Sequence, residues 1–136
     1  MKTLQPARPQ PVTPVARRAV HIKPTGLDAQ LTHLAGQLGV TLKELAPLLQ
    51  LSLSTLHRLR QQTALNGPTA ERVELLRGII QHGLRVYGGE ESAFQDWLRY
   101  PLGELDGRTP LQTLTTIAGF TQVDDVLGRI EHGIFF

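Results

Sequence analysis

Side chains that can donate hydrogen bonds to phosphates and base edges gather between residues 52 and 61, in the sequence SLSTLHRLRQ. Leu56 and Leu59 recur at helical spacing, so the polar side chains fall on the other faces of a predicted helix. The stretch contains no acidic residue that would repel a polyanion. The candidate DNA-binding residues are Ser52, Ser54, Thr55, His57, Arg58, Arg60 and Gln61.

The residues before this helix predict that it is the second helix of a helix-turn-helix running from Leu42 to about Arg60. Inward positions are filled by leucines, and the small residue Ala46 stands where two crossing helices would touch, as the motif requires. Two residues depart from the pattern: Gln50 occupies the turn position where glycine is usual, and Pro47 lies inside the first helix. The alternative is an ordinary pair of packed helices, because leucines at helical spacing also form cores.

Residue types that carry enzymatic chemistry are not arranged for it in this sequence. The five histidines have no metal-ligand spacing, and neither a phosphate-binding glycine loop nor a nucleophile elbow is present. The chain also has no cysteine, which excludes thiolate nucleophiles and cysteine-based zinc sites. We therefore expect no enzyme, no catalytic residue, no metal site and no cofactor.

Charge divides the chain into two unequal parts. Residues 1–88 contain eleven basic and four acidic side chains, a net charge of +7, whereas residues 89–136 contain three basic and eight acidic ones, a net charge of −5. Opposite charges favour different partners, a polyanion for the first part and a protein with a cationic surface for the second. The alternative is that charge is unevenly scattered in a short chain.

The elements that must position these residues are all predicted to be helices. Residues 1–26 hold five of the nine prolines and are expected to be a disordered basic tail. A helix-turn-helix domain is predicted over 27–88, with helices from Leu27 to a glycine cap at Gly39, from a Thr41–Glu44 capping box to about Gln50, from Ser52 onward, and from Thr69 to the Gly88–Gly89 break.

A third part, 89–136, is predicted to be a smaller helical domain. An apolar stripe that includes Trp97 ends before Pro101, and a helix is expected from Thr109–Pro110 to a stop at Gly119. The last helix is expected to start with a capping box at Thr121 and to end before Gly133. The apolar segments are too short to cross a bilayer and the start lacks a signal-peptide pattern, so a cytoplasmic protein with no membrane partner is expected.

The stretch from Phe94 to Ile134 closely resembles the C-terminal domain of Xre-type antitoxins of RES-Xre toxin-antitoxin modules, in the Xre/MbcA/ParS antitoxin family. The resemblance is carried by three motifs: Trp97-Leu98, Gly107-Arg108-Thr109-Pro110 and the closing sequence LGRIEHG at 127–133. It covers about 40 residues well, and residues 27–89 also resemble the family's Xre-like helix-turn-helix domain. The proline-rich start lies outside it.

This resemblance implies a type II antitoxin that neutralises a RES-fold toxin, which consumes NAD, and that binds its own promoter as a homodimeric autorepressor. A toxin site for the phosphates of NAD should be basic, so Glu131 and the terminal carboxylate of Phe136 are candidate phosphate substitutes. The candidate toxin-binding residues are Arg129, Glu131, His132, Gly133, Ile134, Phe135 and Phe136.

Two alternatives remain open at this level. Phe135 and Phe136 either insert into the toxin or pack on their own domain, because leaving them in water would forfeit roughly 1.5 to 3 kcal/mol each. The whole chain is either an antitoxin or a stand-alone helix-turn-helix repressor whose acidic domain only dimerises.

Overall fold

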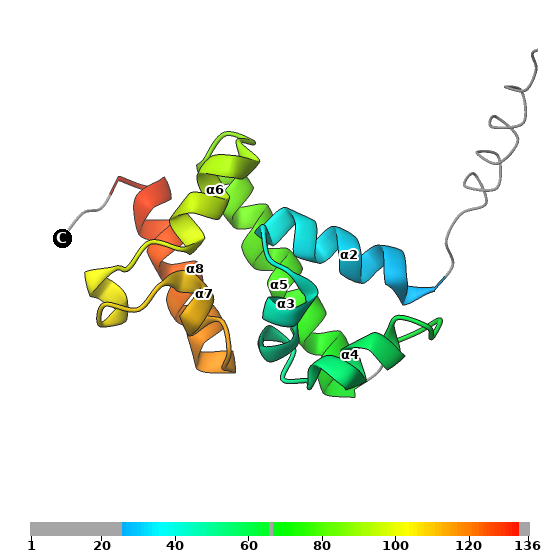
Figure 1. Ribbon diagram of the computed structural model, residues 1–136. Coiled ribbons are helices and arrows are strands. Elements are labelled where there is room, and N and C mark those ends of the chain that lie inside the picture. Colours follow the sequence, from blue (N-terminus) through cyan, green and yellow to red (C-terminus); the bar gives the residue numbers. More distant parts are fainter. Residues whose placement is uncertain (1–25, 66, 134–136) are drawn as a thin grey trace, which may run out of the picture.

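The computed structural model describes residues 26–65 and 67–133, and all regular secondary structure within them is helical (Figure 1). The predicted all-α fold is therefore confirmed. The prediction of a disordered tail falls on residues outside this range, apart from Gly26. The elements are α2 (Leu27–Leu38), α3 (Leu42–Leu48), α4 (Leu53–Leu59), α5 (Gly67–Val86), α6 (Glu91–Leu98), the short 3-10 helix η2 (Gly103–Leu105), α7 (Pro110–Thr113) and α8 (Ile117–Glu131).

The starts and ends of the first helices follow the local signals in the sequence. Helix α2 ends at Gly39, whose φ of 70° is the left-handed conformation that glycine adopts at low cost. Helix α3 begins with the predicted capping box, in which Glu44 N–H donates to Thr41 Oγ1 at 3.1 Å and Thr41 N–H donates to Glu44 Oε1 at 3.0 Å. Ser52 caps α4 by accepting a hydrogen bond from Thr55 N–H at 3.1 Å.

The turn between α3 and α4 accommodates Pro47 and Gln50, the two residues that depart from the helix-turn-helix pattern, in different ways. Pro47 is exposed, so its ring lies away from the core. Gln50 adopts a φ of 60°, the conformation in which glycine is usual at this position. Its side-chain amide donates to Pro47 O at 3.2 Å and to Thr115 O, in the loop between α7 and α8, at 2.8 Å. These two bonds hold the turn in a conformation that is unfavourable for a residue with a side chain.

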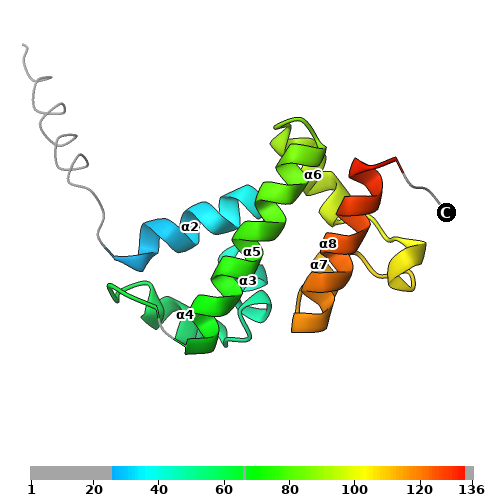
Figure 2. The ribbon, with the colours of Figure 1, turned by 180° about the vertical axis from the view of Figure 1, so that it is seen from behind.

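Helix α5 is the 20-residue element on which α2, α6 and α8 pack, and at 1.5 Å per residue it is about 30 Å long. It begins at Gly67, two residues earlier than predicted. It contacts α2 and α6 on one side and runs beside α8 on the other, as the two opposite views show (Figures 1 and 2). Gly83 allows close approach, because a Cβ atom added there would lie 2.0 Å from the Phe94 ring.

The second half differs from the prediction at the start of its last helix. Helix α7 ends at Thr113, and α8 starts at Ile117, with Thr116 as its cap, so the predicted capping box at Thr121 is wrong. Gly119 does not terminate a helix. Instead, Gly119 lies in the first turn of α8. A Cβ atom at this position would stand 1.8 Å from the carbonyl oxygen of Thr113, so only glycine fits there.

One hydrophobic core runs from Leu27 to Leu127, across the Gly88–Gly89 break. Trp97 is 8% exposed, and its ring centroid lies 6.4 Å from those of Tyr87 and Phe94. Since Tyr87 directly follows α5, these contacts fix α6 against the end of that helix. The division into domains at residue 88 stays a prediction, and the core shows that the two parts pack together. Within residues 26–65 and 67–133, no helix is both long and apolar enough to span a membrane.

Candidate functional site

Helix α4 presents the polar face that was predicted to bind DNA. Leu56, which is fully buried, fixes the helix on the core, and this leaves Ser54, His57 and Arg58 exposed. Gln61, just beyond the helix, is also exposed. These side chains therefore share one accessible surface at the end of the molecule.

Two of the predicted DNA-binding hydroxyls are engaged within the helix start. Ser52 Oγ accepts from Thr55 N–H and also donates to Thr55 Oγ1 at 2.9 Å. Thr55 is half-buried, while Ser52 is exposed. The two residues thus stabilise the start of α4, and the Ser54 hydroxyl lies 3.4 Å from Ser52 Oγ.

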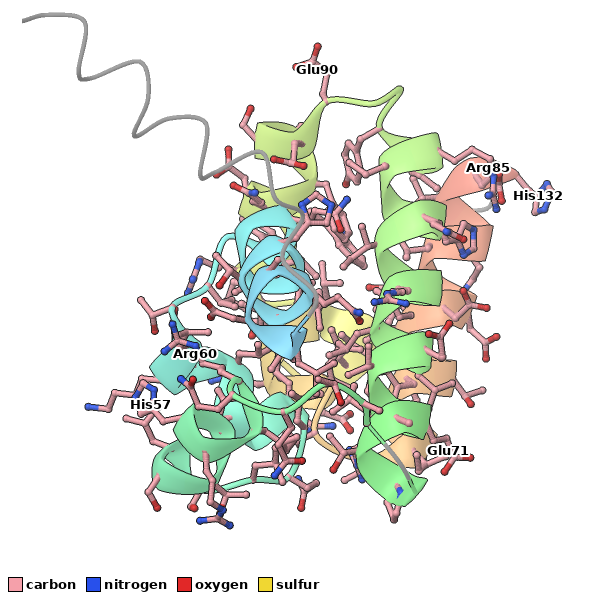
Figure 3. The ribbon with its side chains drawn as sticks, turned by 90° about the vertical axis from the view of Figure 1, so that its right-hand side faces the viewer. His57, Arg60, Glu71, Arg85, Glu90 and His132 are labelled. Atoms are coloured by element: carbon pink, nitrogen blue, oxygen red, sulfur yellow. The ribbon has the colours of Figure 1, made fainter. Side chains whose placement is uncertain are left out.

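Arg60 differs from Arg58 in its surroundings. The Arg60 guanidinium donates from Nε to Asp28 Oδ1 at 2.7 Å, and its Nη1 lies 3.0 Å from His57 Nδ1 (Figure 3). A guanidinium only donates, so His57 Nδ1 is the acceptor in this contact. Arg60 therefore ties α4 to α2. Arg58 is exposed, and among the described residues it has neither an ion pair nor a side-chain hydrogen bond, so it is the better placed of the two to reach a phosphate.

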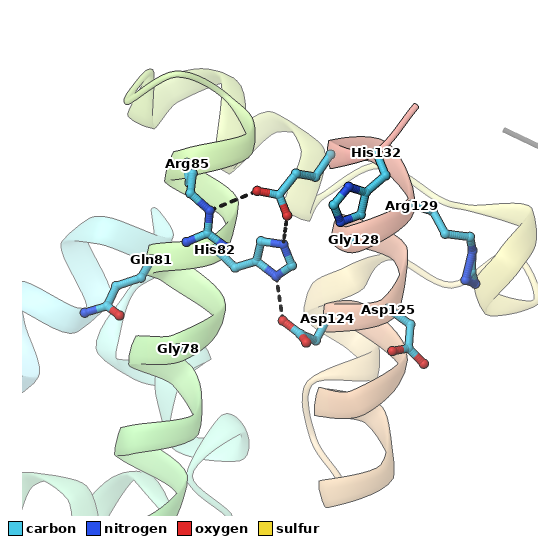
Figure 4. A pocket seen from close by; sticks show the side chains of 10 residues that line it. Gly78, Gln81, His82, Arg85, Asp124, Asp125, Gly128, Arg129 and His132 are labelled. Atoms are coloured by element: carbon cyan, nitrogen blue, oxygen red, sulfur yellow. Dashed lines mark hydrogen bonds and ion pairs between the residues drawn. The ribbon is translucent and has the colours of Figure 1, made fainter. Parts of the chain in front are cut away.

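A second polar cluster joins α5 to α8 near the end of the chain. Glu131 accepts hydrogen bonds from Arg85 Nε at 2.9 Å and from His82 Nε2 at 3.0 Å, and the other ring nitrogen of His82 lies 2.6 Å from Asp124 Oδ1 (Figure 4). The hydrogen bond from Arg85, followed by that from His82, lowers the pKa of Glu131 below its ordinary value of 4.5.

These residues line a groove of about 620 Å³ between the two helices. Three of the predicted toxin-binding residues, Arg129, Glu131 and His132, are among them. Gly133 follows at a φ of 71° and ends α8, while Ile134, Phe135 and Phe136 lie outside the described residues. The Glu131 carboxylate, predicted to serve as a phosphate substitute, is held by Arg85 and His82 of its own chain.

The residues of α5 that line this groove are not among those predicted from the sequence. They are Gly78, Gln81, His82 and Arg85. Their spacing of three and four residues is that of one helix face, so the sequence places them on one side of the helix. The partners of His82 stand 42 and 49 residues away along the chain, and no local pattern indicates such contacts.

Hydrogen bonds also connect the two halves near the helix-turn-helix. Arg99 donates to Glu44 Oε2 at 3.1 Å and to Gly39 O at 2.8 Å, and the bond from Arg99, with that from the Thr41 backbone, lowers the pKa of Glu44. Arg72, like Gln50, donates to Thr115 O, at 3.3 Å. The turn that precedes α4 is thus fixed partly by the second half of the chain.

Family comparisons match both halves in order. Residues 20–78 match the family model described as the antitoxin Xre-like helix-turn-helix domain, and residues 82–133 match that of the antitoxin Xre/MbcA/ParS C-terminal toxin-binding domain. The chain belongs to the Xre-type antitoxin family. The exposed face of α4 lies in the first match, and the whole of α8 lies in the second.

Two curated relatives carry the name Antitoxin Xre. The antitoxin from Yersinia enterocolitica serotype O:8 / biotype 1B is 30% identical over 66 residues, which is 48% of this chain and 45% of the relative. The antitoxin from Photorhabdus laumondii subsp. laumondii is 29% identical over 65 residues, 48% of this chain and 44% of the relative. The matched segment thus spans slightly less than half the length of either Xre antitoxin.

Among the residues that the structure describes, no three histidine, aspartate or glutamate side chains come together to hold a metal ion. Four of the polar side chains at the groove contact one another between α5 and α8: His82, Arg85, Asp124 and Glu131.

Proposed function

We propose that this chain is the antitoxin of a type II toxin-antitoxin module, which binds and neutralises a RES-domain toxin that consumes NAD and binds its own promoter as a homodimeric repressor. The observation that carries the proposal is the order of the two family matches, a helix-turn-helix domain followed by a toxin-binding domain. Co-expression with the product of the adjacent gene, followed by purification through one tag, tests it. A RES-domain protein recovered in the complex supports the proposal.

The exposed face of α4 is the proposed DNA-reading surface. Arg58→Ala should weaken binding to the chain's own promoter, because each phosphate contact that is lost lowers the slope of log affinity against log salt by about 0.9. Arg108→Ala is the matched control, since Arg108 is also exposed but lies in the acidic half. Equal slopes for the Arg58 variant and the wild type would remove α4 from the interface.

Arg60 remains part of the proposed surface, with a different expected signature. Because Arg60 also binds Asp28, Arg60→Ala should lower both DNA affinity and the free energy of unfolding. Arg58→Ala should lower DNA affinity alone. Measuring DNA affinity and the free energy of unfolding for both variants therefore distinguishes contact with DNA from stabilisation of α4.

The proposed toxin-binding surface consists of the end of α8 with Arg129, Glu131, His132 and Gly133, continued by residues 134–136. We propose that this end of the chain enters the NAD cleft of the toxin and competes with NAD. Removal of residues 134–136 should leave promoter binding intact and restore NAD consumption when purified toxin and truncated chain are mixed. Full inhibition by the truncated chain would move the inhibitory surface onto α8 itself.

The homodimer is tested by light scattering of the purified chain, which should give twice the 15.0 kDa mass of one chain. Promoter binding without any recoverable toxin would instead favour the stand-alone repressor, whose acidic half only dimerises.

A further inference from the structure

The groove between α5 and α8 is open because glycine stands on both of its walls. Gly78 on α5 and Gly128 on α8 both line it (Figure 4). A Cβ atom added at either position would meet no other heavy atom within 4 Å. The close approach that requires glycine at Gly83, also on α5, therefore does not explain these two residues.

Glycine inside a helix destabilises it relative to alanine, so both walls keep an unfavourable residue that leaves space at the surface. The space lies beside the paired cluster of His82, Arg85 and Glu131. The two glycines therefore leave part of the groove unfilled by the chain's own side chains.

The charges in the groove indicate what kind of group fits. The groove is lined by three carboxylates (Asp124, Asp125 and Glu131) and two arginines (Arg85 and Arg129). The Arg85 and His82 side chains already face the carboxylates of Glu131 and Asp124. Asp125 is exposed on the α8 wall, and within the described residues its carboxylate has neither a hydrogen bond nor an ion pair. Residues 89–136 as a whole carry eight acidic and three basic side chains. A cationic group is therefore the complementary occupant.

We propose that the α5–α8 groove is a docking surface for the toxin and receives an arginine- or lysine-bearing segment of it beside Asp125. The inference rests on the proposed antitoxin function, and it extends the toxin-binding surface to the middle of α5. Gly78 and Gln81 lie outside the residues that match the toxin-binding family model, whereas the α8 wall lies inside them.

The groove is well separated from the DNA-reading face. Arg85 and His132, which line the groove, lie at the opposite corner of the molecule from His57 and Arg60 (Figure 3). A toxin segment in the groove would therefore leave α4 accessible, so variants of the groove should change toxin binding without changing promoter binding.

The experiment fills the groove without disturbing the core. Gly78→Gln and Gly128→Gln place a neutral, flexible side chain in the open space, and each should weaken binding of the full-length chain to the purified toxin at least tenfold. Asp125→Asn should weaken it several-fold and reduce its dependence on salt. Gly36→Gln on α2 is the matched control, because Gly36, like Gly78, is exposed and has open space beside its Cα.

Promoter binding and thermal unfolding are measured for every variant. If Gly128→Gln lowers the melting temperature, its effect on toxin binding could come from a destabilised α8. The test then depends on Gly78→Gln, because Gly78 lies on α5, away from the end of α8. Unchanged toxin affinity of Gly78→Gln and Asp125→Asn, beside a wild type that binds, would overturn the docking surface while leaving the antitoxin function in place. A wild type that binds no toxin would overturn the antitoxin function itself. A change in the mass of the toxin-free chain on filling the groove would show a contact between two copies and would also overturn the inference.

Discussion

Gln50 adopts a glycine-like backbone conformation in the turn before α4. Substitutions at this position separate the free energy lost to that conformation from the free energy gained by the hydrogen bonds of the Gln50 side chain. A residue with a side chain at a φ of 60° is disfavoured by about 1–2 kcal/mol relative to ordinary helical backbone. Against this cost stand the two bonds from the Gln50 amide, to Pro47 O and Thr115 O, each worth about 0.5–1.5 kcal/mol. The two contributions are of similar size.

Alanine and glycine at this position should therefore behave differently. Gln50→Ala loses both bonds and keeps the strain, so it should lower the free energy of unfolding by about 1–2 kcal/mol, near the low end because the bonds are exposed. Gln50→Gly loses the bonds and removes the strain, so it should be more stable than Gln50→Ala by about 1 kcal/mol.

Equilibrium unfolding in urea, followed by circular dichroism, measures both variants. The control is the same pair of substitutions at Gln61, which is exposed and has an ordinary negative φ. There glycine should be the less stable of the two, because it only adds freedom to the unfolded chain. If Gln50→Gly unfolds at no higher urea concentration than Gln50→Ala, strain at Gln50 is not part of the turn's energetics.

Three further predictions follow from the contacts described above. Thr41→Ala removes the acceptor for Glu44 N–H and should cost about 1 kcal/mol in urea unfolding. Gly83→Ala forces a methyl group against the Phe94 ring and should cost about 1–3 kcal/mol or more, whereas Gly78→Ala in open space should raise the melting temperature. The pKa of Glu131 is lowered in the folded chain, so its stabilising effect is present above its unfolded pKa and is lost as pH falls through the folded value; Glu131→Gln should flatten the fall in stability measured below about pH 4.5.

Local signals in the sequence were sufficient for the first helices. The Thr41–Glu44 capping box and the Gly39 cap involve residues within three or four positions of one another, so the pattern and the structure coincide. The last helix was placed too late because Gly119 was interpreted as a stop signal. Its real role is close packing against Thr113, which depends on the path of the loop after α7 and not on local conformation.

The candidate surfaces show the same limit. The exposed face of α4 was predictable, because periodicity alone separates its buried leucine from its polar residues. The ion pair of Arg60 with Asp28 and the pairing of Glu131 with Arg85 join residues 32 and 46 positions apart. Such contacts depend on how helices are placed against each other, which hydrophobic spacing does not specify.

Helix α5 has a practical consequence for separating the two proposed activities. One family match ends at residue 78 and the next starts at residue 82, so the boundary between the two matches falls inside the continuous helix α5. Ile79 and Ile80, which lie at this boundary, are both buried. A cut there would leave each fragment with half of a helix and an uncovered apolar face, so fragments meant to bind only DNA or only toxin should each retain α5 whole. For the same reason, a chimera that exchanges toxin specificity between two relatives should be joined before Gly67, so that α5 and α8 come from the same parent.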